Sequence, residues 1–195
     1  MSDRKKIGFV FIENYADWEY GLLAASAVEW LGADAVALTP GAGTVTSIAG
    51  FRRTGDRGVS AEENADLGAV AVIGSDRWTV ADAPDIAPLL QAVGARGGVV
   101  GGICAGTLAL ARAGLFQTRT HTSNGADWSD ENLPDYKGRE NYRDVPFAIC
   151  DDRVVSAPGT APATFASAFL EAVFPDKMEM LTEFRAMMAR EFQPG

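Results

Sequence analysis

GGICAGT, at residues Gly101 to Thr107, stands between two valines and a run of leucine and alanine. Residues 98–103 have the continuous apolar character of a buried strand, and residues 105–113 have that of a helix. Cys104 therefore lies on the turn between strand and helix, which is the position of the nucleophile in an elbow of the form G-x-C-x-G. Glycine suits the flanking positions because such a turn is strained and leaves little room for neighbouring side chains.

The position of Cys104 suggests a reactive thiol. A sulfur at a helix N-terminus is surrounded by free backbone N–H groups that favour the thiolate, so we expect a lowered pKa and a nucleophilic role. The alternative is that Cys104 is a small buried hydrophobe beside a tight turn. Cys150 lies in an ordinary strand with no glycine turn, and packing explains it better.

The rest of the chain alternates between strands and helices, which predicts an α/β fold: a three-layer α/β/α sandwich around a flavodoxin-like, mostly parallel sheet. Asp17 is a candidate N-cap for the first helix, and Pro84 is placed to begin the second. Ligands are expected at the carboxyl ends of the strands. The expected strands are 6–12, 34–39, 69–73, 98–103 and 120–123, with hairpins over 45–54 and 147–156. The expected helices are 17–31, 82–93, 105–113, a short helix within 124–144, 162–173 and 175–191.

Composition narrows the class of protein. The chain has 195 residues and a formal net charge of −9, so we expect one domain over 1–195 and no nucleic-acid or membrane partner. The polar residues 1–6 are expected to lead directly into a first strand and not to form a signal peptide. Two cysteines in unlike contexts favour neither a disulfide framework nor a zinc site, and we expect a cytoplasmic protein with no metal and no cofactor.

Several motifs together resemble the DJ-1/PfpI (ThiJ) superfamily, whose fold is similar to class I glutamine amidotransferase domains. The resemblance covers most of the chain. Residues 120–144 further resemble a bacterial subgroup whose members carry the names of intracellular proteases or amidotransferases. The motifs are the elbow at Cys104, Glu19 within Asp17–Tyr20, the stretch VIGSDRW at 72–78 and the stretch SAPGT at 156–160.

The resemblance implies a role for Glu19 beside the sulfur. In the family an acid at this position touches the elbow cysteine and is often protonated, because a carboxyl group near a thiolate is desolvated and repelled. Such a pair can act as nucleophile and proton-transfer partner. The alternative for Glu19 is a solvated carboxylate that the helix dipole favours.

The resemblance also implies an oxyanion hole. Gly74 and Ser75 match a glycine pair that contributes backbone N–H groups in relatives, and Ala105 would supply another donor. Ser75 replaces the second glycine, and an ordinary turn at the end of a strand is the alternative interpretation.

The family histidine beside the cysteine has no clear counterpart. The best register places Asn124 there, as a candidate substrate-binding residue, while the single histidine, His121, lies three residues earlier and is either catalytic or a packed or surface histidine. Trp18 and Trp78 are candidates for the wall of an apolar pocket or for a subunit contact. Relatives are commonly homodimers, so a homodimer is expected here.

Two classes of function follow from these residues. The first is a cysteine-dependent hydrolase, hydratase or lyase that acts on a small electrophilic molecule. The alternative is a redox sensor or oxidative-stress protein that works through oxidation of Cys104. A glutamine amidotransferase-like protein without transferase activity, or a binding domain that keeps the elbow for its fold, also stays open.

Overall fold

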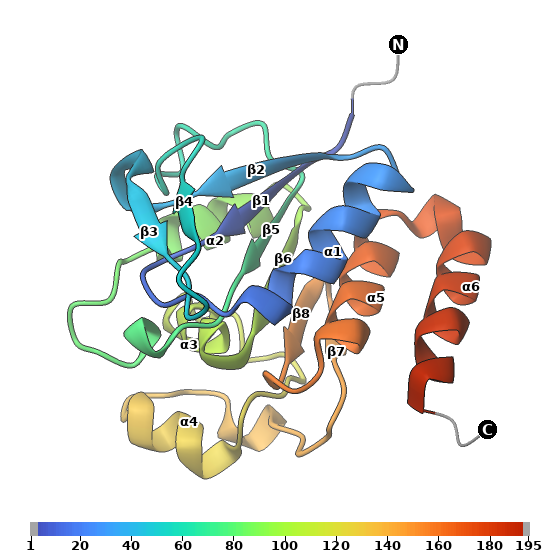
Figure 1. The fold of residues 1–195 in the computed structure, drawn as a ribbon. Coiled ribbons are helices and arrows are strands. Elements are labelled where there is room, and N and C mark those ends of the chain that lie inside the picture. Colours follow the sequence, from blue (N-terminus) through green and yellow to red (C-terminus); the bar gives the residue numbers. More distant parts are fainter. Residues whose placement is uncertain (1–3, 193–195) are drawn as a thin grey trace.

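The computed structural model describes residues 4–192; residues 1–3, where the predicted polar start lies, fall outside this range. A six-stranded sheet forms the middle layer of the fold (Figure 1), in the order β2-β1-β5-β6-β8-β7. All neighbouring strands are parallel except the pair β7–β8 at one edge. The strands are β1 (Lys6–Val10), β2 (Asp34–Leu38), β5 (Ala69–Val72), β6 (Val99–Ile103), β7 (Ile149–Asp151) and β8 (Val154–Ala157).

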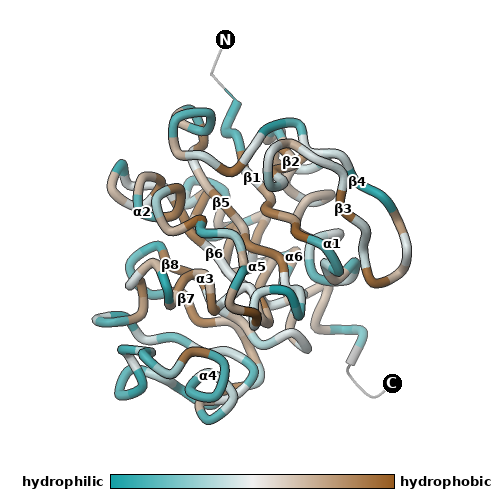
Figure 2. Tube along the Cα trace, turned by 90° about the vertical axis from the view of Figure 1, so that its left-hand side faces the viewer, coloured by the Kyte–Doolittle hydropathy of each residue, from teal (hydrophilic) through white to brown (hydrophobic). Residues whose placement is uncertain are grey.

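Helices cover both faces of the sheet, which confirms the predicted three-layer α/β/α architecture. One core lies between the sheet and α1 (Asp17–Glu29) and α5 (Pro162–Val173), and α6 (Met178–Ala189) extends it by packing against the outer side of α5. The other lies between the sheet and α2 (Ala87–Ala95) and α3 (Thr107–Arg112). The strands of the sheet run through the hydrophobic interior, whereas the segment around α4 (Ala126–Asn132) is mostly hydrophilic (Figure 2).

Two helix starts differ from the sequence prediction. Asp17 is the first residue of α1 and not its N-cap; its carboxylate accepts a hydrogen bond from Ala49 N–H at 3.2 Å. The second helix begins at Ala87, five residues later than predicted, because residues 79–86 form an irregular loop and Pro88, not Pro84, occupies the first turn.

One predicted strand is absent from the described part of the chain. Residues 120–123 make only an isolated bridge, between His121 and Tyr142. Its backbone N–H groups bind side chains of the edge strands and not a strand backbone: Thr120 N–H donates to the Asp151 carboxylate of β7, and Thr122 N–H donates to Ser156 Oγ of β8.

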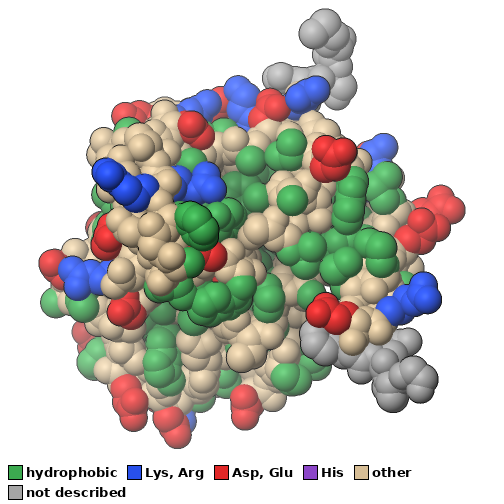
Figure 3. Space-filling view, in the orientation of Figure 1, with side chains coloured by type: hydrophobic (Ala, Val, Ile, Leu, Met, Phe, Trp, Pro, Cys, Tyr) green, Lys and Arg blue, Asp and Glu red, His purple; other side chains and the backbone are tan. Residues whose placement is uncertain are grey.

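A separate two-stranded hairpin, β3 (Thr44–Thr46) and β4 (Arg52–Thr54), lies near the beginning of α1. Its inner side is fixed by Arg53, whose guanidinium group lies 4.7 Å from the ring centre of Phe11 and 5.1 Å from that of Tyr20. Its tip exposes Ile48 and Phe51. Figure 3 shows hydrophobic side chains gathered where the hairpin meets α1.

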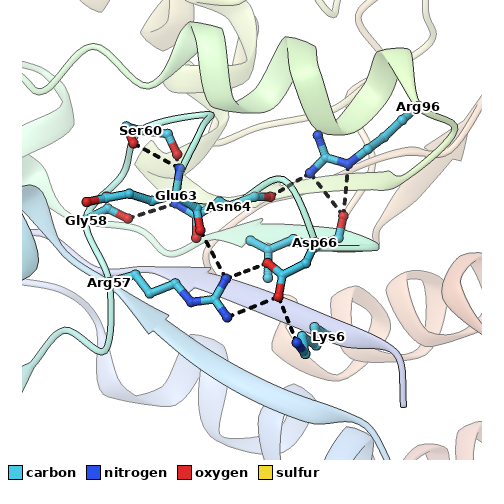
Figure 4. Close-up of polar contacts among 9 residues, drawn as sticks. Lys6, Arg57, Gly58, Ser60, Glu63, Asn64, Asp66 and Arg96 are labelled. Atoms are coloured by element: carbon cyan, nitrogen blue, oxygen red, sulfur yellow. Dashed lines mark hydrogen bonds and ion pairs between the residues drawn. The ribbon is translucent and has the colours of Figure 1, made fainter. Parts of the chain in front are cut away.

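At the opposite, amino end of the sheet, a polar cluster fixes the long loop before β5 (Figure 4). Asp66 binds both Arg57 and Lys6, and these two cations hold the pKa of its carboxyl group well below the usual range. The fully buried Asn64 donates to two loop carbonyls, while Arg96 of the next connection donates to Asn64 O and Leu67 O. The loop is thereby held without regular secondary structure.

Among residues 4–192, no helix is both long and apolar enough to cross a membrane.

Candidate active site

The turn after β6 is a nucleophile elbow. Cys104 has φ 55°, a left-handed conformation that is uncommon for a residue other than glycine. A Cβ atom at Gly106 would lie 2.5 Å from the carbonyl oxygen of Val72, and one at Gly102 would lie 2.8 Å from Leu110. Glycine is therefore required at Gly106, where the neighbour is backbone, and favoured at Gly102, where the Leu110 side chain would have to shift; both fit the G-x-C-x-G pattern. A short 3-10 turn over Cys104–Gly106 leads into α3.

Three groups surround the sulfur of Cys104, which is partly buried. Asn124 Nδ2 donates to Sγ at 3.2 Å, and the backbone N–H of Ala105 lies beside it, where it favours the thiolate. Gly159 packs so closely that a Cβ atom there would lie 2.8 Å from Sγ. Its N–H donates to Asn124 Oδ1 at 3.0 Å, which fixes the orientation of the amide.

Glu19 lies beside Cys104 and is almost completely buried, with 1% of its surface exposed. Its Oε2 accepts a hydrogen bond from Gly74 N–H at 2.6 Å. Its Oε1 has no partner of standard geometry among the described residues, and the Cys104 side chain is its polar neighbour. Burial raises the pKa of this carboxyl group to about 7, against the smaller opposing effects of Gly74 and Cys104. Glu19 is thus a buried acid poised near neutrality and not a solvated carboxylate.

The pKa of the Cys104 thiol is raised, contrary to the lowered value expected from the sequence. Burial is the main cause and the negative charge of Glu19 adds to it, while the donors Asn124 and Ala105 act in the opposite direction. The helix that follows has only six residues after its 3-10 turn, so its dipole is small. Near neutral pH the thiol therefore keeps its proton, while Glu19 is about half ionised.

The three residues expected to form an oxyanion hole differ in what their N–H groups do. The N–H of Gly74 is already bound to Glu19, so it is not free to bind an oxyanion. The N–H of Ser75 makes no hydrogen bond with another described residue, and Ser75 lines the same cavity as Cys104 and Ala105. Ser75 Oγ instead fixes the loop, donating to Glu13 O at 2.5 Å and accepting from Arg77 N–H at 3.1 Å.

His121 does not meet Cys104 in this structure. Its ring stacks on Phe116 at 4.0 Å between centroids, Nδ1 binds the carbonyl oxygen of Arg119 at 2.8 Å, and Nε2 binds the hydroxyl of Tyr136. Burial lowers its pKa, so the ring is neutral at pH 7. It ties the chain around α4 to the body of the fold, and Asn124 occupies the place beside the sulfur.

The two tryptophans considered for a pocket wall have different environments. Trp18 is 55% exposed and lines the cavity beside Cys104, with Nε1 donating to Gly159 O at 3.1 Å. Trp78 is fully buried in the core on the α2 side, with Nε1 donating to Ile73 O at 2.9 Å. The expectation that Trp78 walls the pocket or forms a subunit contact is therefore wrong.

The cavity contains residues that the sequence alone did not indicate. It measures about 270 Å³ and includes Ile48 from the tip of the hairpin, Asn14 and Asp76. The place of Asn14 and Asp76 in loops that follow strands of the parallel sheet could have suggested those two residues, whereas Ile48 comes from the antiparallel hairpin. No group of three or more His, Cys, Asp or Glu side chains within residues 4–192 is arranged to hold a metal ion.

Comparison with known proteins agrees with this geometry. The DJ-1/PfpI family matches residues 5–172. The chain belongs to the DJ-1/PfpI family. Among DJ-1/PfpI relatives, it is 34% identical to the uncharacterized protease YoaZ of Bacillus subtilis over 85% of this chain and 81% of that protein. It is 30% identical to the uncharacterized protease YdeA of the same organism, over 94% of this chain and 90% of that protein.

A solved structure of a DJ-1 superfamily protein from Agrobacterium tumefaciens has a TM-score of 0.82 and 33% identity to this chain, over 94% of this chain and 99% of that one. The similarity therefore extends over nearly the whole of this chain.

Proposed function

We propose that this DJ-1/PfpI protein is a cysteine-dependent enzyme that hydrolyses or hydrates a small electrophilic molecule, with Cys104 as nucleophile and Glu19 as the group that moves the proton. The observation that carries this proposal is the buried carboxyl group of Glu19, with a pKa of about 7, next to a thiol that faces a cavity. A proton-transfer group is most effective when its pKa lies near the working pH.

The first step would be attack of Sγ on the electrophilic carbon of an amide or nitrile-like group. The new S–C bond takes its electron pair from sulfur, the thiol proton passes to the Glu19 carboxylate, and the π electrons move to the substrate oxygen or nitrogen. The N–H groups of Ser75 and Ala105 are the proposed donors to the negative charge that develops there.

The later steps depend on the substrate. An amide would lose its amine, protonated by Glu19, and leave a thioester that water cleaves as Glu19 takes the water proton. A nitrile-like group would give a thioimidate, to which water adds before the thiol leaves, so that the product is an amide. In both cases Cys104 and Glu19 return to their starting protonation.

The test is turnover of a panel of small amides and nitriles by the protein and three variants. Activity is expected to disappear in Cys104→Ser, to persist in Cys150→Ser, and to fall about 10²- to 10⁴-fold in Glu19→Gln. In the unmodified protein kcat/KM should rise with pH through about 7, as Glu19 ionises. Turnover that survives in Cys104→Ser would refute the proposal.

The second candidate function is redox sensing at Cys104. It is favoured by the donors Asn124 Nδ2 and Ala105 N–H around the sulfur, which could bind sulfinate oxygens. Two equivalents of peroxide would each transfer one oxygen atom to sulfur and leave as water. Peptide mass after peroxide treatment distinguishes the candidates: a gain of two oxygen atoms at Cys104 without turnover of any substrate in the panel supports the sensor.

A further inference from the structure

The cavity that leads to Cys104 has walls that are mostly apolar. Four of its residues present mainly apolar surface, and the polar atoms of the others are largely turned away or used in hydrogen bonds. Gly74 N–H and the Glu19 carboxyl group bind each other, and Ser75 Oγ binds the backbone of Glu13. The four apolar residues are Ala16, Trp18, Ile48 and Ala105.

Trp18 and Ile48 are the two large apolar side chains at this cavity, and both are about half exposed. Each is held in place by its neighbours. The indole N–H of Trp18 is bound to Gly159 O at 3.1 Å, and the backbone N–H of Ile48 is bound to Tyr15 O at 3.0 Å. A large exposed apolar pair that is fixed before binding is suited to hold an apolar group of a ligand.

The charges at the cavity are negative. Asp76 lies at its rim, where its carboxylate accepts a hydrogen bond from Asn14 Nδ2 at 3.4 Å, and Glu19 lies beside the sulfur. None of the described residues that line this cavity carries a positive charge. Arg77, although next to Asp76 in sequence, lines a different hollow with Glu13 and Asp82. A carboxylate or phosphate in the Cys104 cavity would therefore meet repulsion and no counter-ion.

We propose that this cavity selects an uncharged electrophile with a compact apolar substituent that lies between Trp18 and Ile48, and that it discriminates against anionic electrophiles. Asp76 and Ile48 determine this specificity. The inference rests on the proposed function only in that Cys104 must be an accessible nucleophile.

A pair of alkylating probes of nearly equal size tests the charge selection without any need for turnover. Iodoacetamide is neutral and iodoacetate is anionic, and in both cases Sγ displaces iodide to form a thioether. Cys150, which is exposed and not packed as the sequence suggests, serves as an internal reference outside the cavity; its charged neighbours are Asp151, Glu171 and Arg153. The ratio of the two rates at one cysteine cancels the thiolate fraction, and peptide mass reports both cysteines separately.

The iodoacetamide-to-iodoacetate rate ratio is expected to be about tenfold larger at Cys104 than at Cys150, the size of effect that one nearby charge produces. N-butyl iodoacetamide should alkylate Cys104 faster than iodoacetamide does, whereas the two reagents should alkylate Cys150 at similar rates. Equal ratios at the two cysteines would overturn the inference.

Matched variants then assign the selectivity to residues. Asp76→Asn and Ile48→Lys should each lower the ratio at Cys104 several-fold, about threefold or more. Phe51→Lys is the control: it adds the same charge to the same hairpin at a side chain that is 69% exposed and does not line the cavity, and it should change the ratio less than about twofold. An unchanged ratio in Ile48→Lys, or an equal change in Phe51→Lys, would contradict the assignment.

The failure of this inference and the failure of the proposed function are separable. Selective alkylation of Cys104 without turnover of any substrate would refute the enzyme and leave the selectivity standing. Cys104-dependent turnover with equal alkylation ratios would support the enzyme and refute the selectivity.

Discussion

Glu19 is a carboxyl group that the fold keeps almost completely from water, and this burial has a cost that depends on pH. Its pKa is about 7 in the folded protein, above the ordinary value of 4.5. Between these two values the folded state keeps its proton while the unfolded chain releases it. The free energy of unfolding therefore falls as pH rises from about 4.5 to about 7, by on the order of 3 kcal/mol, and stays lowered at higher pH.

Replacing Glu19 with glutamine should remove this cost. The amide can still accept from Gly74 N–H but carries no charge, so we expect Glu19→Gln to raise the free energy of unfolding above about pH 7 by roughly 1–3 kcal/mol. Near about pH 4.5 the two proteins should differ little. Urea unfolding at both pH values measures the difference, with the exposed Glu29→Gln on the same helix as control. A lower free energy of unfolding for Glu19→Gln than for the parent protein above about pH 7 would show that the ionised carboxyl group stabilises the fold, and would contradict the prediction.

Asn124 is the residue whose side chain donates a hydrogen bond to the sulfur of Cys104. Its amide donates to Sγ and accepts from Gly159 N–H, so both the nitrogen and the oxygen of the amide are hydrogen-bonded. Asn124→Ala should raise the pKa of Cys104 further and slow its alkylation at fixed pH about tenfold, since a hydrogen bond to a charged group contributes about 1.5–3 kcal/mol.

The matched comparison for Asn124 is His121, which lies three residues earlier and has both ring nitrogens bound elsewhere. His121→Gln should leave the alkylation rate of Cys104 within about twofold and lower the free energy of unfolding instead, because it loosens the contact with Tyr136. A large fall in Cys104 reactivity in His121→Gln, with Asn124→Ala unaffected, would reverse the assignment.

At the level of elements, the junction between β6 and α3 depends on glycine. A methyl group at Gly106 would lie 2.5 Å from the Val72 carbonyl oxygen, which is backbone and cannot move aside cheaply. We expect Gly106→Ala to lower the free energy of unfolding by about 2 kcal/mol or more, or to distort the elbow and remove Cys104 reactivity.

Gly94 in α2 provides the opposite case. A Cβ atom there would meet nothing within 4 Å, and its φ is not positive. Gly94→Ala should raise the free energy of unfolding by up to about 1 kcal/mol, because alanine loses less backbone entropy in a helix. Urea denaturation of the two variants compares them directly, and equal stability of Gly106→Ala and the parent protein would show that the junction tolerates a side chain.

The buried strands and the elbow could be predicted from sequence because each depends on a local pattern: continuous apolar runs and glycines at fixed spacing. Helix starts were less predictable, since a cap depends on which loop lies opposite. Asp17 meets the tip of the hairpin at Ala49, and that contact, 32 residues distant in sequence, places its side chain outside the capping position.

The residues of the candidate site likewise divide into those that a local sequence pattern predicts and those that only tertiary packing brings to the site. Cys104 and Glu19 belong to recognisable local motifs, and the structure brings them together. Ile48 and Gly159 reach the site through the packing of a hairpin and of the loop before α5, so no local pattern identifies them. The prediction that Trp78 lines the pocket is wrong because nearness in sequence to Gly74 and Ser75 does not determine which side of the sheet a side chain faces.

For the molecule as a whole, the excess of negative charge should act on the same site from a distance. The chain has 17 basic and 26 acidic residues, a formal net charge of −9. This charge repels anions during approach, and the local carboxylates of Asp76 and Glu19 repel them again inside the cavity. Added salt separates the two contributions, because salt screens solvent-exposed charges more strongly than charges that are partly buried.

Raising the ionic strength from about 0.01 M to about 0.5 M should therefore speed alkylation of Cys104 by iodoacetate several-fold, as the Debye length falls from about 30 Å to below 8 Å. The rate with iodoacetamide should stay within about twofold, which controls for changes in the thiolate fraction. Part of the discrimination at Cys104 should persist at high salt, while at exposed Cys150 it should almost vanish, because only Cys104 has carboxylates within its cavity. Loss of all discrimination at both cysteines in high salt would mean that net charge alone repels the anion, and that Asp76 and Glu19 add no local selection.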